Sequence, residues 1–466
     1  MYIKAKSEIE KNYSKHLISL CLPLFLLILI VGISNILTSM LIINADGQTL
    51  MNTIPINSLC LTYVSPFNVF CLLSSFVVAF SIRLCILKSK TFDNEIQTSK
   101  YIFIGIIACL LIYIINLLLS CCFSGLYIKS LYNDTYDVTD SLISYVRLSG
   151  IFSIFMITFI FLTVLLDIIG EYKSLLISSI IFAVINNLLV LLFLYGFKLS
   201  INWSIYAFVI SSFITMIYEL YCIIKSKLIN IKIKFKDILP NKNDIYNVFK
   251  LSIYPIIISV VSSILMYLFI LLFKLSETYN YYLVGSFAII IKYVELGVAL
   301  GVTYHFAVKS LLDFNFRFKR FKKSFLLIKV SLIIAALIGF IYFIIVASLS
   351  IPLANIYGLR YYDLFTITLY GKAIRNTILL MIPLFIFLSI IAIYKSLGMK
   401  KIVISHVIII IIFIFGLAIS FNLTKEPFNL TWLSFAIALL VVDIISLLIS
   451  IPYFKYKIVK KKLKTE

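Results

Sequence analysis

Residues 225–250 read KSKLINIKIKFKDILPNKNDIYNVFK, and this is the longest polar, charge-dense interval of the 466-residue chain. It lies near the midpoint, and six apolar segments long enough to cross a membrane stand on each side of it. The interval therefore predicts a linker between two halves of equal helix count. That layout is typical of a membrane protein built from two related helical bundles.

The composition excludes a soluble globular protein. Hydrophobic residues make up 62% of the chain and charged residues only 13%, whereas soluble domains hold about 25% charged residues. The net charge of +21 does not indicate a nucleic-acid partner, because the basic residues lie in short loops between apolar segments, where they orient helices in a membrane.

The eight cysteines lie almost wholly inside apolar segments and show no metal-ligand spacing. We expect them to be packing or lipid-facing residues without disulfides. Four lysines precede the first apolar segment and no A-x-A cleavage site follows it, which predicts a first transmembrane helix and not a cleaved signal peptide.

Apolar segments predict an all-α integral membrane protein with twelve transmembrane helices in two pseudo-symmetric six-helix bundles. The bundles are expected at 1–224 and 250–466, joined by a linker at 225–249. The predicted spans are 17–43, 59–86, 101–128, 143–169, 174–196, 201–224, 250–273, 281–308, 324–350, 376–396, 402–420 and 430–453.

The distribution of Lys and Arg predicts the orientation. One set of loops and both termini hold 30 of these residues, and the opposite loops hold 7. The positive-inside rule then places both termini and the linker on the cytoplasmic side of the cell membrane. The amphipathic segment 351–375 is expected to lie along the outer interface, with Tyr357, Tyr361, Tyr362 and Tyr370.

Residues 166–196 read LDIIGEYKSLLISSIIFAVINNLLVLLFLYG and begin with a short turn at Gly170, Glu171 and Lys173. This stretch resembles the connection between the fourth and fifth helices of the multidrug and toxic compound extrusion (MATE) family, within the MOP flippase superfamily. Weaker similarities follow the same order along nearly the whole chain: Leu22-Pro23, Tyr145 with Arg147, Tyr254-Pro255, LLDFNFRFKRFKKSF at 311–325 and YKSLGMKKIVISHV at 394–407.

The chain also departs from the family pattern. Members coupled to H⁺ or Na⁺ usually carry an Asp about fifteen residues after the first-helix proline, where this chain has Thr38. Many members place a Glu just after the seventh-helix proline, where this chain has Ser259. Arg317 and Phe318 replace a Gly-Ala pair. The usual coupling-ion ligands therefore do not carry over to this sequence.

Three ionisable residues within the predicted spans are candidates for binding a substrate or an ion, because a charge near the bilayer centre needs a partner or water. Lys292 and Glu295 are three residues apart and share one helical face. We expect either that Glu295 binds a proton or cation with Lys292 as its counter-ion, or that the two form a static ion pair. Asp443 lies mid-span in the twelfth segment. We expect it to pair with Lys292, to take up a proton or to have a structural role.

The remaining candidates have polar side chains. Arg147 is expected to attract an anionic head group or to snorkel to the outer interface. Asn186 and Asn187 are expected to bind a substrate or cation, or to hydrogen-bond between helices. His305 is expected to be a hydrogen-bonded histidine near a helix end. Three acids at predicted cytoplasmic helix ends are expected to be solvated, namely Asp167, Glu171 and Glu219.

The resemblance implies a secondary active exporter of an organic cationic or amphipathic substrate, coupled to H⁺ or Na⁺ through Glu295 or Asp443. The second reading is a flippase of the same superfamily for a lipid-linked oligosaccharide, in which Arg147 and Lys292 attract phosphate. A non-transporting membrane scaffold is the third hypothesis. We expect a monomer whose partners are its substrate and membrane lipid, with no enzyme activity, because no nucleotide-binding loop, metal cluster or nucleophile-base pair occurs.

Overall fold

The computed structural model describes residues 13–46, 56–90, 95–131, 136–170, 172–226, 239–275, 281–318, 320–356, 364–422, 433–434 and 436–448. The elements of the first half are α2 (Tyr13–Asp46), α3 (Ile56–Lys90), α4 (Glu95–Cys122), α5 (Ser124–Leu131), α6 (Tyr136–Ile169), α7 (Tyr172–Leu191), the π-helix η1 (Leu192–Gly196) and α8 (Asn202–Lys225). Those of the second half are α10 (Lys242–Leu275), α11 (Tyr281–Arg317), α12 (Phe321–Ser348), α13 (Ser350–Ile356), α14 (Leu364–Ile378), α15 (Met381–Ser396) and α16 (Lys400–Asn422), followed by an apolar helix at 436–448.

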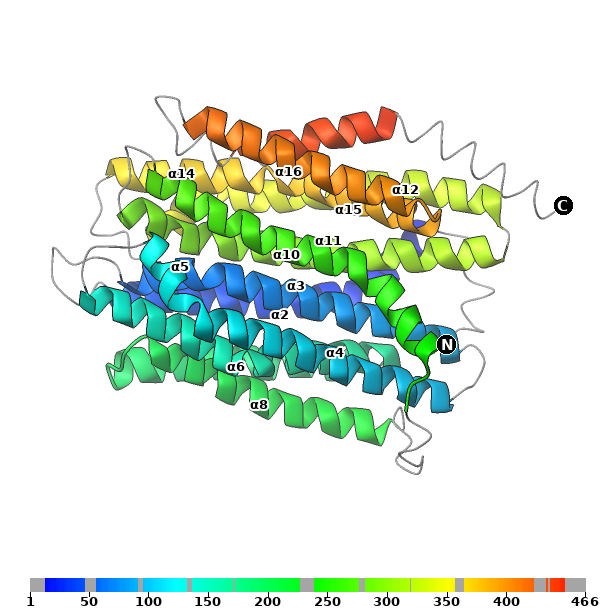
Figure 1. Cartoon of the computed structure of the whole chain (residues 1–466), viewed down its shortest axis with the longest axis horizontal. Coiled ribbons are helices and arrows are strands. Elements are labelled where there is room, and N and C mark those ends of the chain that lie inside the picture. Colours follow the sequence, from blue (N-terminus) through cyan, green and yellow to red (C-terminus); the bar gives the residue numbers. More distant parts are fainter. Residues whose placement is uncertain are drawn as a thin grey trace. The chain divides into compact units, whose positions relative to one another are not determined.

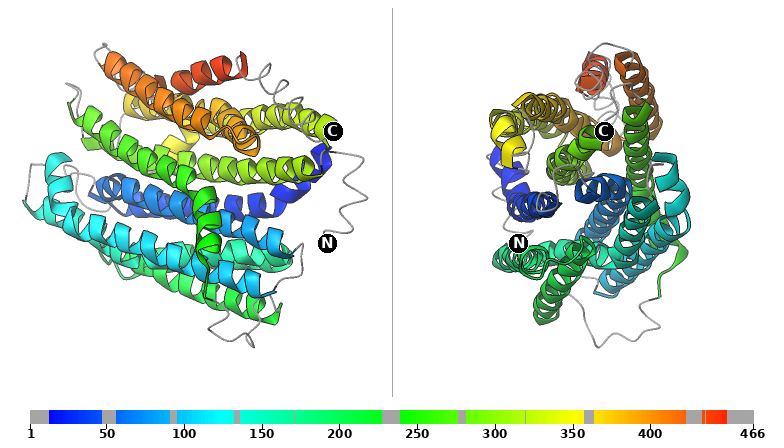
Figure 2. Two further views of the ribbon diagram at one scale, coloured as in Figure 1. Left: turned by 45° about the vertical axis from the view of Figure 1, so that its right-hand side comes forward. Right: turned by 90° about the vertical axis from the view of Figure 1, so that its left-hand side faces the viewer.

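The predicted spans fall on these helices, but not one to one. The span 101–128 runs over α4 and α5, 376–396 begins in α14 and continues as α15, and 430–453 extends beyond the described residues. Nine helices of the described residues are long and apolar enough to cross a membrane, and α10, bent by 43° between Ile253 and Pro255, makes a tenth (Figure 2). Proline removes a backbone donor and clashes with the preceding turn, which explains the bend. Two shorter apolar segments, Ile411–Ser420 and Ala436–Leu448, coincide with the last two predicted spans. The chain is a multi-pass membrane protein.

The helices present apolar surface outward, as lipid contact requires. Large apolar side chains with 40% or more of their surface exposed recur along α4, α7, α8 and α12, among them Leu111, Leu188, Phe213 and Ile333. Polar side chains of the same helices are turned inward. All eight cysteines are free, and six of the eight are buried within apolar helices, so the expectation of packing cysteines without disulfides is confirmed.

Contacts between helices divide the chain into two compact units. One unit is Leu29–Lys292, and the other comprises Met1–Ile28 with Tyr293–Glu466. The bundles predicted at 1–224 and 250–466 are two halves expected to be pseudo-symmetric. Grouping residues by their contacts does not test that symmetry, so the two bundles stay a prediction.

In the unit Leu29–Lys292, α3, α4, α6 and α8 run alongside one another (Figure 1). The α4 and α6 backbones approach closely where Gly150 faces Ser120, because any added Cβ atom would overlap that serine side chain. The unit also includes α10, which packs against α3.

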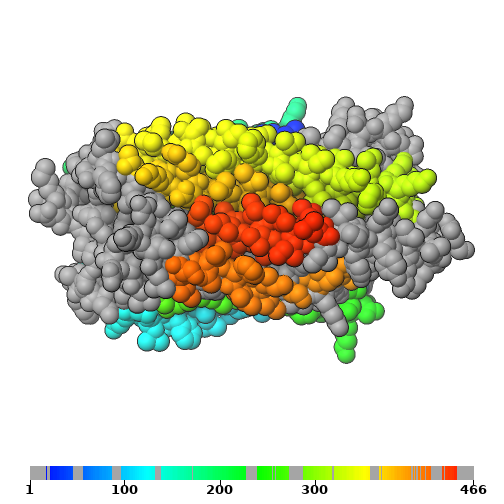
Figure 3. All heavy atoms as spheres, turned by 90° about the horizontal axis from the view of Figure 1, so that it is seen from above, coloured from blue at the N-terminus to red at the C-terminus, as the bar shows by residue number. Residues whose placement is uncertain are grey.

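In the other unit, α12 packs against α15, and the helix at 436–448 lies beside α16 (Figure 3). Gly339 permits the first of these contacts, since a Cβ atom there would lie 2.7 Å from Met381 O. The segment predicted to lie along the outer interface instead contributes α14, and its Tyr370 is buried at 2% exposure. That expectation was wrong for Tyr370, while Tyr357, Tyr361 and Tyr362 lie outside the described residues.

The same glycine turn closes a helix in each unit. Gly170 (φ 81°) follows α6 and Gly398 (φ 77°) follows α15, and both adopt the left-handed conformation that glycine reaches without a steric cost. Each glycine N–H donates at 3.1 Å to the carbonyl three residues earlier, on Asp167 and on Lys395. The two turns are those at which the sequence resembles the MATE family in each half.

Candidate functional site

A network of neutral polar side chains lies inside the unit Leu29–Lys292. Thr38 Oγ1 on α2 accepts a hydrogen bond from Asn186 Nδ2 at 2.8 Å and donates to Asn187 Oδ1 at 3.2 Å. Asn187 Nδ2 donates to Ser34 Oγ at 2.7 Å, and Ser211 Oγ on α8 donates to Asn186 Oδ1 at 3.4 Å. Three helices are therefore joined by side-chain amides and hydroxyls.

Sequence and helix geometry explain why these residues meet. Ser34 and Thr38 are four residues apart and share one face of α2. Asn186 belongs to the buried face of α7 and is 1% exposed. Each hydroxyl and amide finds partners in the network, as buried polar groups require. The network carries no ionisable group, because a threonine stands at the position where the resemblance calls for an acid.

The interhelical role expected for Asn186 and Asn187 fits this geometry. Amide and hydroxyl oxygens are also acceptors that a cation or a substrate donor can use, so their role in binding stays a prediction. Within the part of the chain that the structure describes, no group of three or more His, Cys, Asp and Glu is arranged to hold a metal ion.

A buried ion pair lies in the same unit. Arg83 Nε on α3 donates to Asp167 Oδ2 on α6 at 2.6 Å, with the two side chains 12% and 3% exposed. The expectation that Asp167 is solvated was therefore wrong. Asp167 is on the last turn of α6, but the side of that turn facing α3 is enclosed, and Arg83 is the charge that compensates it.

Glu219 was also predicted to be solvated, and this prediction was wrong as well. Its side chain is 0% exposed, and Thr163 Oγ1 on α6 donates to Glu219 Oε1 at 2.8 Å. Helix α8 continues for six residues beyond Glu219, so the residue lies well inside the bundle. Glu171 lies outside the described residues.

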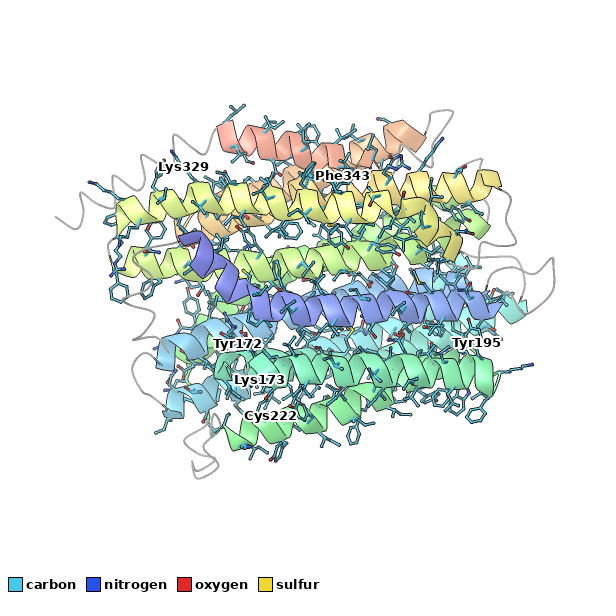
Figure 4. All side chains as sticks on the ribbon, turned by 180° about the vertical axis from the view of Figure 1, so that it is seen from behind. Tyr172, Lys173, Tyr195, Cys222, Lys329 and Phe343 are labelled. Atoms are coloured by element: carbon cyan, nitrogen blue, oxygen red, sulfur yellow. The ribbon has the colours of Figure 1, made fainter. Side chains whose placement is uncertain are left out.

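Figure 4 shows which residues lie at the two ends of α7 and α8. Tyr172, Lys173 and Cys222 lie toward one end of α7 and α8, and Tyr195 lies at the opposite end, where its hydroxyl donates to Leu41 O at 2.8 Å. Glu219 precedes Cys222 by one helical turn. It therefore lies toward the end that the positive-inside rule predicts to be cytoplasmic.

The structure places the other predicted residues as follows. Lys292 and Glu295 are half-buried on α11, three residues apart, and their pairing and role stay predictions. Arg147 is exposed, with Nε donating to Ser124 Oγ at 3.1 Å. Its exposure fits snorkelling, and a head-group contact stays a prediction.

Asp443 is 3% exposed, and neither carboxylate oxygen has a hydrogen-bond partner among the described residues. Its pairing with Lys292 and its uptake of a proton stay predictions. His305 is 5% exposed, and its Nδ1–H donates to Leu388 O at 2.7 Å, because a carbonyl oxygen can only accept. The expected hydrogen bond is confirmed, but the expected position near a helix end was wrong, because α11 continues for twelve residues beyond His305 to Arg317.

Two lysines gather near His305 at one end of α11 and α15. Lys309 forms an ion pair with Asp313 at 2.7 Å. Lys395 is subject to the positive charge of Lys309, and both lysines act electrostatically on His305. This group of four thus holds two lysines and a histidine with a single acid, Asp313.

Sequence reasoning missed Arg83, Thr163 and Glu219. The available signal was the spacing on α8, where Ser211, Thr215 and Glu219 are four residues apart. Such spacing puts all three on one helical face, and that face is buried.

Comparison with known proteins identifies the fold. No protein-family model matches the sequence, and no curated protein matches it. Among solved structures, a MOP superfamily transporter from Pyrococcus furiosus, described as having a binding pocket of reverse polarity, matches with a TM-score of 0.78 and 12% identity over 97% of both chains. A MATE protein in complex with MaL6 matches with a TM-score of 0.75 and 14% identity over 97% of both chains.

A multidrug resistance MATE transporter matches in two states. Its inward-facing structure gives a TM-score of 0.73 at 13% identity, over 94% of this chain and 96% of that one. Its outward-facing structure also gives 0.73 at 13% identity, over 97% of both chains. The present chain has the twelve-helix, all-α fold of MATE and MOP superfamily transporters, and the predicted fold class and resemblance are confirmed.

Proposed function

We propose that this chain, which has the fold of MATE and MOP superfamily transporters, is a secondary active exporter. It moves an organic cationic or amphipathic substrate across the membrane by exposing a binding site alternately to the two sides, in exchange for H⁺ or Na⁺. The observation that carries the proposal is the likeness along 94–97% of the chain to transporter structures, with equal TM-scores to an inward-facing and an outward-facing conformation.

Ion coupling requires groups whose occupancy biases one conformation, since a ligand shifts a conformational equilibrium only by its differential affinity for the two states. The first-helix position of the family acid is Thr38 here, within a neutral network. Coupling therefore rests on acids elsewhere in the helices. Asp443 suits this role, because both of its buried oxygens lack a hydrogen-bond partner among the described residues.

The test is transport by the purified chain in proteoliposomes. A fluorescent organic cation is trapped inside or outside, and a pH gradient or a Na⁺ gradient is imposed. We expect dye movement against its own gradient in response to one of the two, reduced in the Asp443→Asn variant. Dye movement that responds to neither gradient would contradict an ion-coupled exporter.

A lipid-linked oligosaccharide flippase is the second candidate. The observation that favours it is the gathering of Lys309 and Lys395 beside His305 with a single acid, Asp313, since protonated lysines attract phosphate. A fluorescent lipid-linked oligosaccharide in the same vesicles separates the two functions. Transbilayer movement of that lipid without dye transport would favour the flippase.

A further inference from the structure

Glu219 is the one acid of the unit Leu29–Lys292 that is both 0% exposed and mid-helix among the described residues. It belongs to a buried face of α8 that also holds Ser211, Thr215 and Cys222. This face packs against α6 and α7. The carboxyl group is consequently enclosed by three helices in the hydrophobic part of the membrane.

The hydrogen bonds of the carboxyl group fit its protonated form. Oε1 accepts the hydrogen bond from Thr163 at 2.8 Å, while Oε2 has no partner among the described residues. Ser178 on α7 is a second hydroxyl within reach of the carboxyl group, and it also donates to Leu175 O at 2.9 Å. An ionised carboxylate would thus have at most two neutral hydroxyl donors among the described residues, and a buried charge so poorly compensated costs several kcal/mol.

Among the described residues, no charged group on the packed helices forms an ion pair with Glu219. On α6 the nearest is Asp167, one turn beyond Thr163, and the charge of Arg83 on α3 is already balanced by Asp167. Helix α7 offers Tyr172 and Lys173 at its first turn. Helix α8 itself offers Tyr218, Cys222 and Lys225, and Lys225 lies over the Tyr221 ring at 5.9 Å.

Glu219 also stands in a row of polar side chains within the apolar unit. Toward one end, Thr215 and Ser211 follow at successive turns of α8, and Ser211 reaches the Asn186 and Thr38 network. Toward the other end, Thr163 leads one turn along α6 to Asp167 and Arg83. Glutamine would provide the same link to Thr163 without an ionisable group, so a purely structural role does not require a glutamate.

We propose that Glu219 is a proton-binding site, and that this proton is the coupling ion. The first part of this inference, the proton site, stands by itself. The second part, that this proton is the coupling ion, rests on the proposed function. Glu219 holds a proton on Oε2 while the helices enclose it. When the bundle opens toward the Arg83 and Asp167 end, the proton passes to water, and the carboxylate that remains keeps the hydrogen bond from Thr163. Chains of acidic and polar groups of this kind serve as proton relays in membrane transporters.

Infrared difference spectroscopy of the full-length protein in lipid nanodiscs tests the site directly. A pH titration of the wild type should show a carboxylic-acid C=O band at neutral pH that disappears at alkaline pH. One component of this band should be absent in Glu219→Gln and kept in the control Asp140→Asn, which changes an exposed acid of α6. Thr163→Val, which removes the hydrogen bond to Oε1, should move the position and titration midpoint of that component. A spectrum unchanged by Glu219→Gln would overturn the site.

Transport measurements test whether the proton bound at Glu219 is also the coupling ion. In proteoliposomes, Glu219→Gln should lose dye accumulation driven by a pH gradient by at least about tenfold, and should keep movement down the dye's own gradient. Accumulation that remains at the wild-type level, or that follows Na⁺ alone, contradicts the coupling role. A wild-type protein that moves no substrate contradicts the proposed function and with it the coupling, while the proton site itself is decided by the spectroscopic titration.

Discussion

Arg83 Nε lies 2.6 Å from Asp167 Oδ2, and the two residues are 84 positions apart in the sequence. The pair joins α3 to α6 at the end of the unit where Gly170 turns the chain into α7. Both side chains are largely buried, so the pair fixes two helices relative to each other and leaves neither charge in lipid.

Removing one member of this pair should be strongly destabilising. Arg83→Met leaves a buried carboxylate without its counter-ion, a change that costs about 3–5 kcal/mol. The double variant Arg83→Met/Asp167→Leu should recover most of that loss, because no unpaired charge remains. The measurement is the unfolding temperature in detergent, followed by size-exclusion chromatography, of the wild type, the single variant and the double variant.

Lys250→Met is the control. Lys250 on α10 is exposed and lies over the exposed Tyr246 ring at 5.7 Å, so removing its charge leaves no buried charge behind. Surface substitutions of this kind change stability by about 0.5 kcal/mol or less. Equal losses in Arg83→Met and Lys250→Met would mean that the Arg83 pair is not enclosed.

Thr38→Val should loosen the network between α2 and α7. Valine has nearly the shape of threonine but offers neither an acceptor to Asn186 nor a donor to Asn187. Leaving such amide groups without partners costs about 1–3 kcal/mol. Thr303→Val is the control, since Thr303 Oγ1 donates to Ala299 O within its own helix. The unfolding temperature should fall clearly in the first variant and little in the second.

Gly339→Ala should weaken the packing of α12 against α15. The new methyl group would meet backbone atoms at 2.7 Å (Met381 O) and 2.9 Å (Ile382 Cα), which cannot rotate away as a side-chain end can. We expect a loss of about 1–3 kcal/mol, as for other overpacked positions. Gly416→Ala, which meets no atom within 4 Å, should be neutral. Thermal unfolding of both variants provides the comparison.

Helix positions were predictable from the sequence because hydrophobic length is a local property. The predicted spans fall on helices, and Gly170 was recognised as a turn from its neighbours alone. The network residue Asn186 was also found, because a mid-span amide is conspicuous in an apolar segment.

The burial of individual polar side chains was not predictable from the sequence, because it depends on which neighbouring helix covers each helix face. Asp167 and Glu219 were assigned to solvent from their nearness to helix ends. Arg83 and Thr163, which lie 84 and 56 residues away from them in the sequence, decide their environment. Tyr370 was assigned to the outer interface from its amphipathic segment, but α14 continues into a buried helix.

Alternating access is tested most directly by distances between spin labels. In a background without the eight cysteines, one label replaces the exposed Tyr221 and a second replaces Phe318, which lies in the other unit. A control pair joins Tyr221 to Ile96 within one unit. We predict that double electron–electron resonance in nanodiscs shows two distance populations for the first pair, whose ratio changes with pH or Na⁺, and one for the control. A single, condition-independent distance for both pairs would contradict a transporter that alternates between two states.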